Sequence, residues 1–181
     1  MRITGGRWRS RRLKGPPRGM PLRPTPDALR ERAFAVLSGL VTDARVLDLF
    51  AGTGAVGLEA LSRGAREAVF VERHRKAAAL IEANLSALGA DEAARVLVRP
   101  VLSAVRALVA RGERFDLVWA DPPFELWEEG AQALEAVATL LTEDGVACLE
   151  CPATAEWRGK ALRLERELAG GASRLLILRP R

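Results

Sequence analysis

The chain has 181 residues, of which 28 are basic and 23 acidic, and 49% of its residues are hydrophobic. This length and balance fit one globular domain with a buried core and exclude wholesale disorder. No apolar run approaches the length of a membrane span, and the arginine-rich start lacks the apolar stretch of a signal peptide, so we expect a cytoplasmic protein.

The charge is unevenly distributed. Residues 1–32 carry ten basic and two acidic side chains, whereas the remaining residues carry 18 basic and 21 acidic ones. A nearly neutral domain therefore follows a basic segment. This asymmetry favours a polyanionic partner, nucleic acid before membrane, although a basic tail can also serve solubility alone.

Residues 1–24 are predicted to form a basic arm, and residues 25–181 the folded domain. The arm mixes basic residues with glycines and four prolines and has no helical period. Ile3, Trp8 and Leu13 can anchor a short hairpin within it.

The first predicted helix spans residues 25–40, "TPDALRERAFAVLSGL". Thr25 is suited to cap it, Pro26 to its first turn, and Asp27 to the positive end of its dipole. Gly39 indicates its end.

Strands and helices then alternate. Apolar runs predict strands at 44–50, 68–72, 94–99, 115–120 and 145–151, with helices between them. The last segment, "ALRLEREL" and "SRLLILRP" around a glycine turn, predicts an antiparallel hairpin. Five β-α repeats predict an α/β fold with helices on both faces of a parallel sheet, and the hairpin makes it a mostly parallel sheet of seven strands.

The two cysteines form a C-x-x-C spacing, which raises the question of a metal. A zinc site needs two further ligands, and the only histidine, His74, is far from Cys148 and Cys151 in the sequence. We therefore expect reduced thiols at a strand end and no metal.

A glycine loop, Gly52-x-Gly54-x-x-Gly57, follows the first predicted strand. Ligands of open parallel sheets bind there, beside the carboxyl ends of the strands. Alone, this pattern also fits a dinucleotide, but Asp48 would repel a pyrophosphate and would attract the ammonium and sulfonium of S-adenosylmethionine. The alternative is that Asp48 only accepts hydrogen bonds from the loop's own amides.

A second acid ends the next strand. Glu72 follows Gly54 by 18 residues, a position from which a carboxylate accepts hydrogen bonds from both ribose hydroxyls. Its alternative role is a surface ion pair with Arg73 or Arg75.

The tetrapeptide Asp121-Pro122-Pro123-Phe124 follows the fourth predicted strand. Two prolines stiffen the backbone and remove N–H groups, which leaves the Asp121 carboxylate and main-chain carbonyls as acceptors. Such a cluster suits an amino group on a nucleobase, since acceptors free its lone pair and stabilise the positive charge that develops during methyl transfer. Phe124 offers a ring for an extruded base. The alternative is an ordinary turn.

Together these motifs resemble those of the RsmD-type methyltransferases of 16S ribosomal RNA. The resemblance covers nearly the whole chain, through "ITGGRWRSRRL", "LRPTPDALRERAF", "VLDLFAGTGAVGLEALSRGA" and "DPPF". It implies a Rossmann-like class I methyltransferase fold, S-adenosylmethionine as methyl donor, and the 2-amino group of a guanine as acceptor. "DPPF" alone is shared with enzymes that methylate adenine or cytosine amines.

The resemblance also implies roles for particular residues. Asp121 to Phe124 would hold the amine, Arg30 would lie near the cofactor carboxylate, and the other cofactor contacts would come from Asp48, Ala51, Gly52, Thr53, Gly54, Glu72 and Arg73. The family commonly places an Asp or Asn after the third strand to read adenine; this chain has Val101 there, so no side chain is assigned.

The basic arm would contact RNA phosphates in a salt-sensitive manner, through Arg7, Arg9, Arg11, Arg12, Lys14 and Arg18. The partner would be 16S rRNA or a small-subunit particle, and a monomer needs no further assumption. Three other interpretations stay open: an adenine or cytosine amino-methyltransferase acting on DNA or RNA, a non-catalytic RNA-binding assembly factor, and a Rossmann oxidoreductase. Asp48 and the terminal hairpin disfavour the last.

Overall fold

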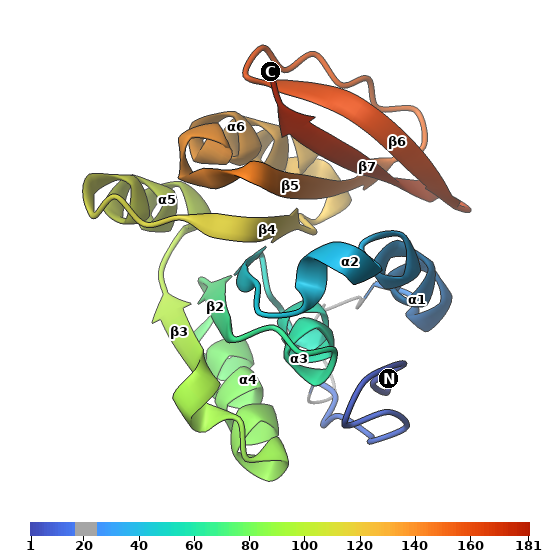
Figure 1. The fold of residues 1–181 in the computed structure, drawn as a ribbon, viewed down its shortest axis with the longest axis vertical. Helices are drawn as coiled ribbons and strands as arrows, with labels where there is room; N and C mark the ends of the chain where they lie inside the picture. Colours follow the sequence, from blue (N-terminus) through green and yellow to red (C-terminus); the bar gives the residue numbers. More distant parts are fainter. Residues whose placement is uncertain (17–24) are drawn as a thin grey trace.

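The structure is a computed structural model that describes residues 1–16 and 25–181. One sheet of seven strands runs through it in the order β3-β2-β1-β4-β5-β7-β6 (Figure 1). The parallel strands are β1 (Arg45–Leu49), β2 (Glu67–Glu72), β3 (Ala94–Val98), β4 (Phe115–Ala120) and β5 (Leu141–Pro152). The antiparallel hairpin consists of β6 (Leu162–Gly170) and β7 (Ser173–Pro180). The predicted fold class is confirmed.

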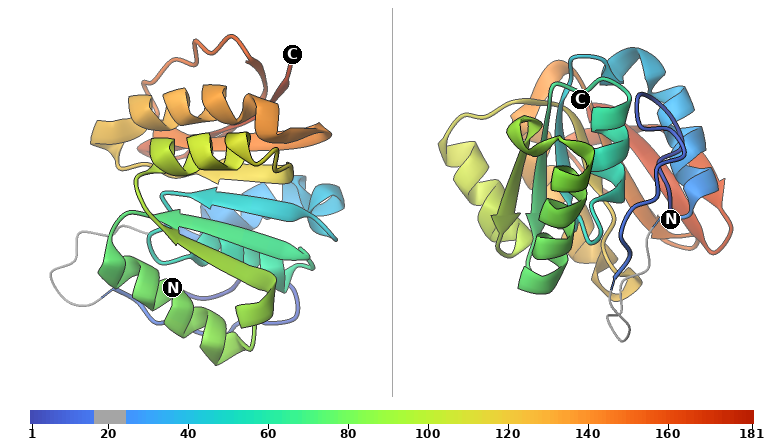
Figure 2. Two further views of the ribbon diagram at one scale, coloured as in Figure 1. Left: turned by 90° about the vertical axis from the view of Figure 1, so that its left-hand side faces the viewer. Right: turned by 90° about the horizontal axis from the view of Figure 1, so that it is seen from below.

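Helices cover both faces of this sheet (Figure 2). One face is covered by α1 (Asp27–Val36), α2 (Ser38–Val41), α3 (Ala55–Ser62) and α4 (Arg75–Leu88), and the other by α5 (Val101–Ala110) and α6 (Trp127–Val137). Short 3₁₀ turns lie at Asp91–Ala93, Phe124–Leu126 and Ala138–Leu140.

Alternate residues of the central strands enter two separate cores. Val46, Phe70 and Trp119 pack under α1 to α4, whereas Leu47 and Val118 pack under α5 and α6. Since both sheet faces are covered, the central strands are almost continuously apolar, which is why the sequence revealed them.

The first predicted helix is wrong in two respects. It is interrupted at Leu37, between α1 and α2, and Pro26 rather than Thr25 stands at its N-cap, without a side-chain cap. The Thr25 hydroxyl donates instead to the carboxylate of Asp121, 96 residues away in sequence. A tertiary contact has therefore displaced the local capping role.

The first residues form the short hairpin that the sequence suggested. Arg2 and Arg12 form an isolated antiparallel bridge. Ile3 and Leu13 are buried in the core, and Trp8 packs against it partly buried. In Figure 1 this segment lies beside α3.

Glu59 of α3 fastens the hairpin to the domain. This fully buried carboxylate accepts hydrogen bonds from the Thr4 amide (2.8 Å) and the Thr4 hydroxyl (2.7 Å). It also pairs with Arg30 (3.3 Å) and Arg63 (2.8 Å). Because its oxygens are so fully engaged, the buried charge is compensated.

We expect Gly57→Ala to destabilise the domain. A Cβ at Gly57 would lie 2.3 Å from Cε1 of Phe70, so α3 would have to move away from the sheet, at a cost of about 1–3 kcal/mol. Thermal unfolding measures this loss.

The matched control is Gly39→Ala, because a Cβ at Gly39 meets nothing within 4 Å. Equal melting temperatures for the two variants would contradict the close packing of α3 on Phe70.

Candidate active site at the carboxyl ends of β1 and β4

The predicted ligand loop and the D-P-P-F motif adjoin each other. From β1 the chain builds β2 and β3 on one side of the sheet and then returns to β4 on the other. The Asp121 amide donates to the Leu49 carbonyl at 3.3 Å. The two motifs therefore meet at the switch point of the sheet, where ligands of such folds bind.

The loop after β1 turns through left-handed backbone. Phe50, Gly52 and Gly54 have φ of 59°, 54° and 76°. Gly54 donates to the Ala51 carbonyl at 2.7 Å and directly precedes α3. A bulky residue such as Phe50 is strained in this region, and strain of this kind concentrates at functional loops.

Asp48 is buried beneath this loop, and its Oδ2 accepts the Gly57 amide at 2.9 Å. Burial raises its pKa to about 7, the Gly57 hydrogen bond opposes that rise, and the nearby Glu72 adds to it. Among the described residues only this amide donates to Asp48. The other oxygen therefore accepts no hydrogen bond from the described residues.

Glu72 holds the loop from the neighbouring strand. Its two oxygens accept the Gly52 amide at 2.9 Å and the His74 amide at 2.8 Å. The side chain is 5% exposed, so the predicted alternative, a surface ion pair, is wrong. Each oxygen keeps a lone pair for a further donor.

The remaining predicted cofactor residues lie in the loop after β1 and just beyond β2. Ala51 and Thr53 lie in the loop, and the Thr53 hydroxyl donates to the Met1 sulfur at 3.3 Å. Arg73 lies just beyond β2 and donates to His74 Nε2 at 3.1 Å. Val101, which the resemblance places where the family reads adenine, is buried at the start of α5.

Arg30 has a different environment from the predicted one. It is fully buried, and its guanidinium contacts Glu59, Asp27 and the carbonyls of Thr25 and Arg2. These partners occupy all three of its nitrogens. The structure thus ties Arg30 to the N-terminal hairpin, and its place near the cofactor carboxylate stays a prediction.

The D-P-P-F motif presents both acceptors and an exposed ring. Asp121 is partly exposed and accepts the Thr25 hydroxyl at 2.5 Å. Pro122 is buried, and a Cβ at Gly130 of α6 would lie 2.6 Å from its Cγ. Phe124 is 44% exposed. The helix therefore braces the first proline while the ring stays accessible.

The sequence analysis missed three residues around Asp121. Thr25 was interpreted as a cap, Gly130 gave no signal within a regular helix, and Glu150 was passed over. Glu150 lies near the carboxyl end of β5 and is buried. An acid at the carboxyl end of the otherwise apolar "GVACLEC" was the signal that could have revealed it.

The predicted RNA-contacting residues that the structure describes lie on the N-terminal hairpin. The side chains that the structure describes are exposed, namely Arg7, Arg9, Arg11, Arg12 and Lys14. Arg18 lies outside the described residues. Trp8 stacks under Arg7, whose guanidinium carbon lies 4.0 Å from the ring centroid.

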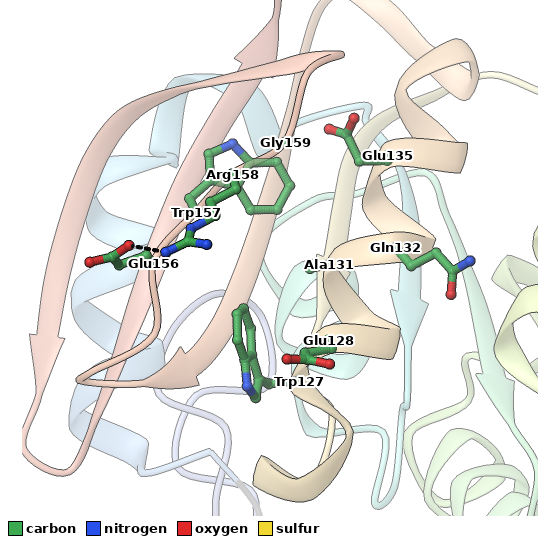
Figure 3. A pocket seen from close by; sticks show the side chains of 9 residues that line it. All are labelled: Trp127, Glu128, Ala131, Gln132, Glu135, Glu156, Trp157, Arg158 and Gly159. Atoms are coloured by element: carbon green, nitrogen blue, oxygen red, sulfur yellow. Dashed lines mark hydrogen bonds and ion pairs between the residues drawn. The ribbon is translucent and has the colours of Figure 1, made fainter.

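A cavity of about 220 Å³ lies apart from the predicted site. Trp127 at the start of α6 and Trp157 in the segment before β6 flank it (Figure 3). Acidic side chains, Glu128, Glu135 and Glu156, share its lining with Arg158. None of the predicted site residues lines it.

Cys148 and Cys151 are free and buried. Within residues 1–16 and 25–181, no three His, Cys, Asp or Glu side chains gather as a metal site. Over the same ranges no helix has both the length and the apolar character to cross a bilayer.

Comparison with known proteins identifies the class and then the family. Over 137 residues the chain is 42% identical to "Ribosomal RNA small subunit methyltransferase D" of Escherichia coli. The aligned region covers 75% of this chain and 67% of that protein. A solved hypothetical protein of Thermus thermophilus superposes with a TM-score of 0.84 at 33% identity and covers 99% of both chains. A more distant solved structure, described as "a putative methyltransferase complexed with SAH", superposes with a TM-score of 0.68 at 16% identity. The match covers 87% of this chain and 50% of that one.

The fold and the site thus define an S-adenosylmethionine-dependent methyltransferase. The family model "Conserved hypothetical protein 95" matches residues 1–178, and the chain belongs to this family. The resemblance to the RsmD-type enzymes is thereby confirmed.

We expect Asp48→Asn to weaken binding of S-adenosylhomocysteine by about ten- to a hundredfold, because a charge-assisted contact to its ammonium is lost. In the wild type, affinity should rise as the pH passes upward through about 7, where Asp48 becomes ionised. The variant should lose this pH dependence in calorimetric titrations.

Unfolding provides the control. A carboxyl whose pKa is raised in the folded state contributes stability at low pH that is lost as the pH rises through the folded pKa. Asp48→Asn should therefore melt no lower than the wild type at pH 8. If Asp48→Asn bound S-adenosylhomocysteine as tightly as the wild type, the role of Asp48 would be limited to its hydrogen bond with the Gly57 amide.

Proposed function

We propose that this protein transfers a methyl group from S-adenosylmethionine to the 2-amino group of a guanine in 16S ribosomal RNA. The observation that carries the proposal is the contact of the Asp121 amide with Leu49, which joins the amine-holding motif to the cofactor loop. The name of the Escherichia coli relative supports small-subunit ribosomal RNA as substrate.

The residues of the loop fit the proposed cofactor. Gly52 and Gly54, both with positive φ, let the main chain approach a ligand closely. Asp48 provides a carboxylate with a free oxygen for the ammonium, and Glu72 would receive the ribose hydroxyls. When bound, the cofactor supplies an electrophilic methyl group. An anionic pyrophosphate would meet two buried carboxylates and be repelled.

The D-P-P-F motif would prepare the amine. The Asp121 carboxylate and the carbonyls of the rigid turn accept its hydrogens, which favours the pyramidal nitrogen and directs its lone pair outward. The same acceptors stabilise the positive charge that develops on nitrogen. Phe124 stacks on the extruded base, and α6 keeps the turn fixed through Gly130 and Pro122. After transfer the nitrogen carries a positive charge, and it loses one proton to solvent to restore neutrality.

The substrate would reach this site through the basic hairpin. Its exposed arginines would neutralise RNA phosphates, while the D-P-P-F turn holds the base. The partner is 16S rRNA or a small-subunit particle, the protein acts as a monomer, and the proposal places it in the cytoplasm with its substrate. Methylation of adenine or cytosine amines, in DNA or RNA, is the alternative reaction at the same turn.

We expect Asp121→Ala to reduce methyl transfer by at least about a hundredfold, because the variant loses an acceptor aimed at the developing charge. Affinity for S-adenosylhomocysteine should change little. Radiolabelled transfer to unmodified small-subunit RNA or particles, followed by nucleoside analysis, measures both rate and product.

Detection of N2-methylguanosine supports the proposed reaction. Methyladenosine or methylcytidine would establish the alternative, and transfer by Asp121→Ala at the wild-type rate would refute the acceptor role.

We expect replacement of Arg9, Arg11 and Arg12 by Gln to weaken RNA binding and to lessen its salt dependence. Each lost phosphate contact lowers the slope of log K against log salt by about 0.7–0.9. Binding titrations at several salt concentrations measure the slope.

Gln substitutions remove the charge of these exposed side chains, keep them polar and unbranched, and leave Ile3, Thr4 and Leu13 in place. The matched control replaces Arg106, Arg111 and Arg114, exposed on and after α5. If the control lowered the slope as much, the hairpin would not be the specific RNA contact.

A further inference from the structure

Asn84 is a buried polar residue that the proposed chemistry does not use. It lies in α4 in line with Ala77 and Ile81, on the face that the helix turns towards the core. Only 2% of Asn84 is exposed. Because a buried side-chain amide is costly unless it is hydrogen-bonded, its partners show what it is for.

The hydrogen bonds of Asn84 all go to main-chain atoms of other segments. Its Oδ1 accepts the Lys14 amide at 2.8 Å, and its Nδ2 donates to the Lys14 carbonyl at 3.2 Å. The side chain thus pairs with Lys14 much as a neighbouring strand would. Nδ2 also donates to the Thr53 carbonyl at 3.5 Å. One side chain therefore joins the N-terminal hairpin to the cofactor loop.

Thr53 contacts the hairpin from a second direction as well. Its hydroxyl donates to Met1 Sδ at 3.3 Å. The Met1 carbonyl in turn accepts the Leu13 amide at 3.4 Å, across the hairpin. Both ends of the hairpin thus meet at Thr53, one directly and the other through Asn84.

A further anchor of the hairpin lies at the opposite end of α3. The Ser62 hydroxyl accepts the Trp8 amide at 3.0 Å and donates to the Gly5 carbonyl at 2.6 Å. Ser62 is the last residue of α3, whereas the cofactor loop precedes its first residue. Ser62 therefore holds the hairpin with one donor and one acceptor, as Asn84 does, but both of its hydrogen bonds go to the hairpin.

The contact between Asn84 and Thr53 is sensitive to small movements of the loop. At 3.5 Å it is at the outer limit of a hydrogen bond, so a slight displacement strengthens or breaks it. Thr53 stands between Gly52 and Gly54, which both have positive φ, and glycine leaves the backbone the greatest freedom. A ligand that fixes the main chain of this loop therefore also fixes the Thr53 carbonyl against Asn84.

We propose that Asn84 is a positioning residue that couples the two binding sites, so that cofactor in the loop and RNA on the hairpin each strengthen binding of the other. A ligand that orders the loop also orders Asn84 and the main chain of Lys14, and the second ligand then loses less conformational entropy on binding. The RNA half of this coupling rests on the proposed function, whereas the link between loop and hairpin does not.

Hydrogen exchange of the wild-type protein tests the link without RNA. S-adenosylhomocysteine should slow exchange of the Lys14 amide by about threefold or more, because this amide donates to Asn84. The Trp8 amide, held by Ser62, is the internal reference and should slow less. No slowing at Lys14, or slowing at Trp8 that is as large or larger, would overturn the proposal.

Titrations with both ligands then measure the coupling. The affinity for S-adenosylhomocysteine is compared with and without saturating unmodified small-subunit RNA, and the affinity for this RNA with and without S-adenosylhomocysteine. In the wild type both ratios should be about fivefold or more, and linkage requires them to be equal. Asn84→Ala should bring both to within about twofold of one, whatever its affinity for each ligand alone. Ratios of one in the wild type, or undiminished ratios in Asn84→Ala, would contradict the coupling.

Ser62→Ala is the matched control. It removes a comparable pair of main-chain contacts from the hairpin but leaves Asn84 and Thr53 in place, so it should keep the wild-type ratios. Loss of the ratios in both variants would assign the coupling to docking of the hairpin in general and would overturn the role of Asn84. If Asn84→Ala does not fold, the exchange measurement on the wild type still decides.

These readouts separate this proposal from the proposed function. Protection of the Lys14 amide by S-adenosylhomocysteine, in a protein that methylates no RNA, would disprove the proposed function and leave the link between loop and hairpin intact. Methylation of RNA by a protein whose two affinity ratios equal one would leave the proposed function intact and disprove the coupling.

Discussion

The convergence of four carboxyl groups at one edge of the sheet is the constraint on which the rest of the site depends. These groups lie at or near the carboxyl ends of four parallel strands and are buried or partly buried there, namely Asp48, Glu72, Asp121 and Glu150. Each is stabilised differently: Asp48 by one amide, Glu72 by two amides, and the other pair by hydroxyls. An edge of this kind selects ligands that bring positive charge or N–H donors and excludes phosphate, which explains why a dinucleotide-like glycine loop belongs here to a methyl donor.

The N-terminal hairpin is physically continuous with this edge. Glu59 binds both Thr4 and Arg30, and the Arg30 guanidinium also reaches the Thr25 carbonyl at 3.3 Å. Thr25 in turn donates to Asp121. The buried pair of Arg30 and Glu59 thus links the hairpin to Thr25, and its charges are compensated because the remaining hydrogen bonds of both side chains are largely satisfied. Basic side chains on a docked hairpin lose less entropy on meeting RNA than those of a loose tail.

The sequence revealed what is encoded locally and missed what tertiary contacts determine. Buried parallel strands are apolar runs, so the bounds of β4 were predicted to the residue. The glycine loop and the D-P-P-F motif were recognised from their local sequence alone. Thr25 is a residue type that commonly caps helices, yet its hydroxyl donates to Asp121, 96 positions away in the sequence. Arg30 matched a family pattern, but its burial against Glu59 depends on how α1 and α3 pack. Gly130 and Glu150 lie beside the turn after β4 because α6 and β5 flank that turn in the fold, and the sequence does not show this arrangement.

The ionisation of Asp121 decides whether the amine can react. A protonated Asp121 would present an O–H donor, and the acceptor nearest to it would be the nitrogen lone pair that must attack the methyl group. An ionised Asp121 can only accept, so it binds the amine hydrogens and leaves the lone pair free. Burial raises the pKa of Asp121 to about 8, and the negative charges of Glu150 and Asp48 add to that rise, whereas the Thr25 hydrogen bond opposes it. An amine that brings N–H donors to Asp121 stabilises the ionised form, so binding of the base and ionisation of its acceptor favour each other.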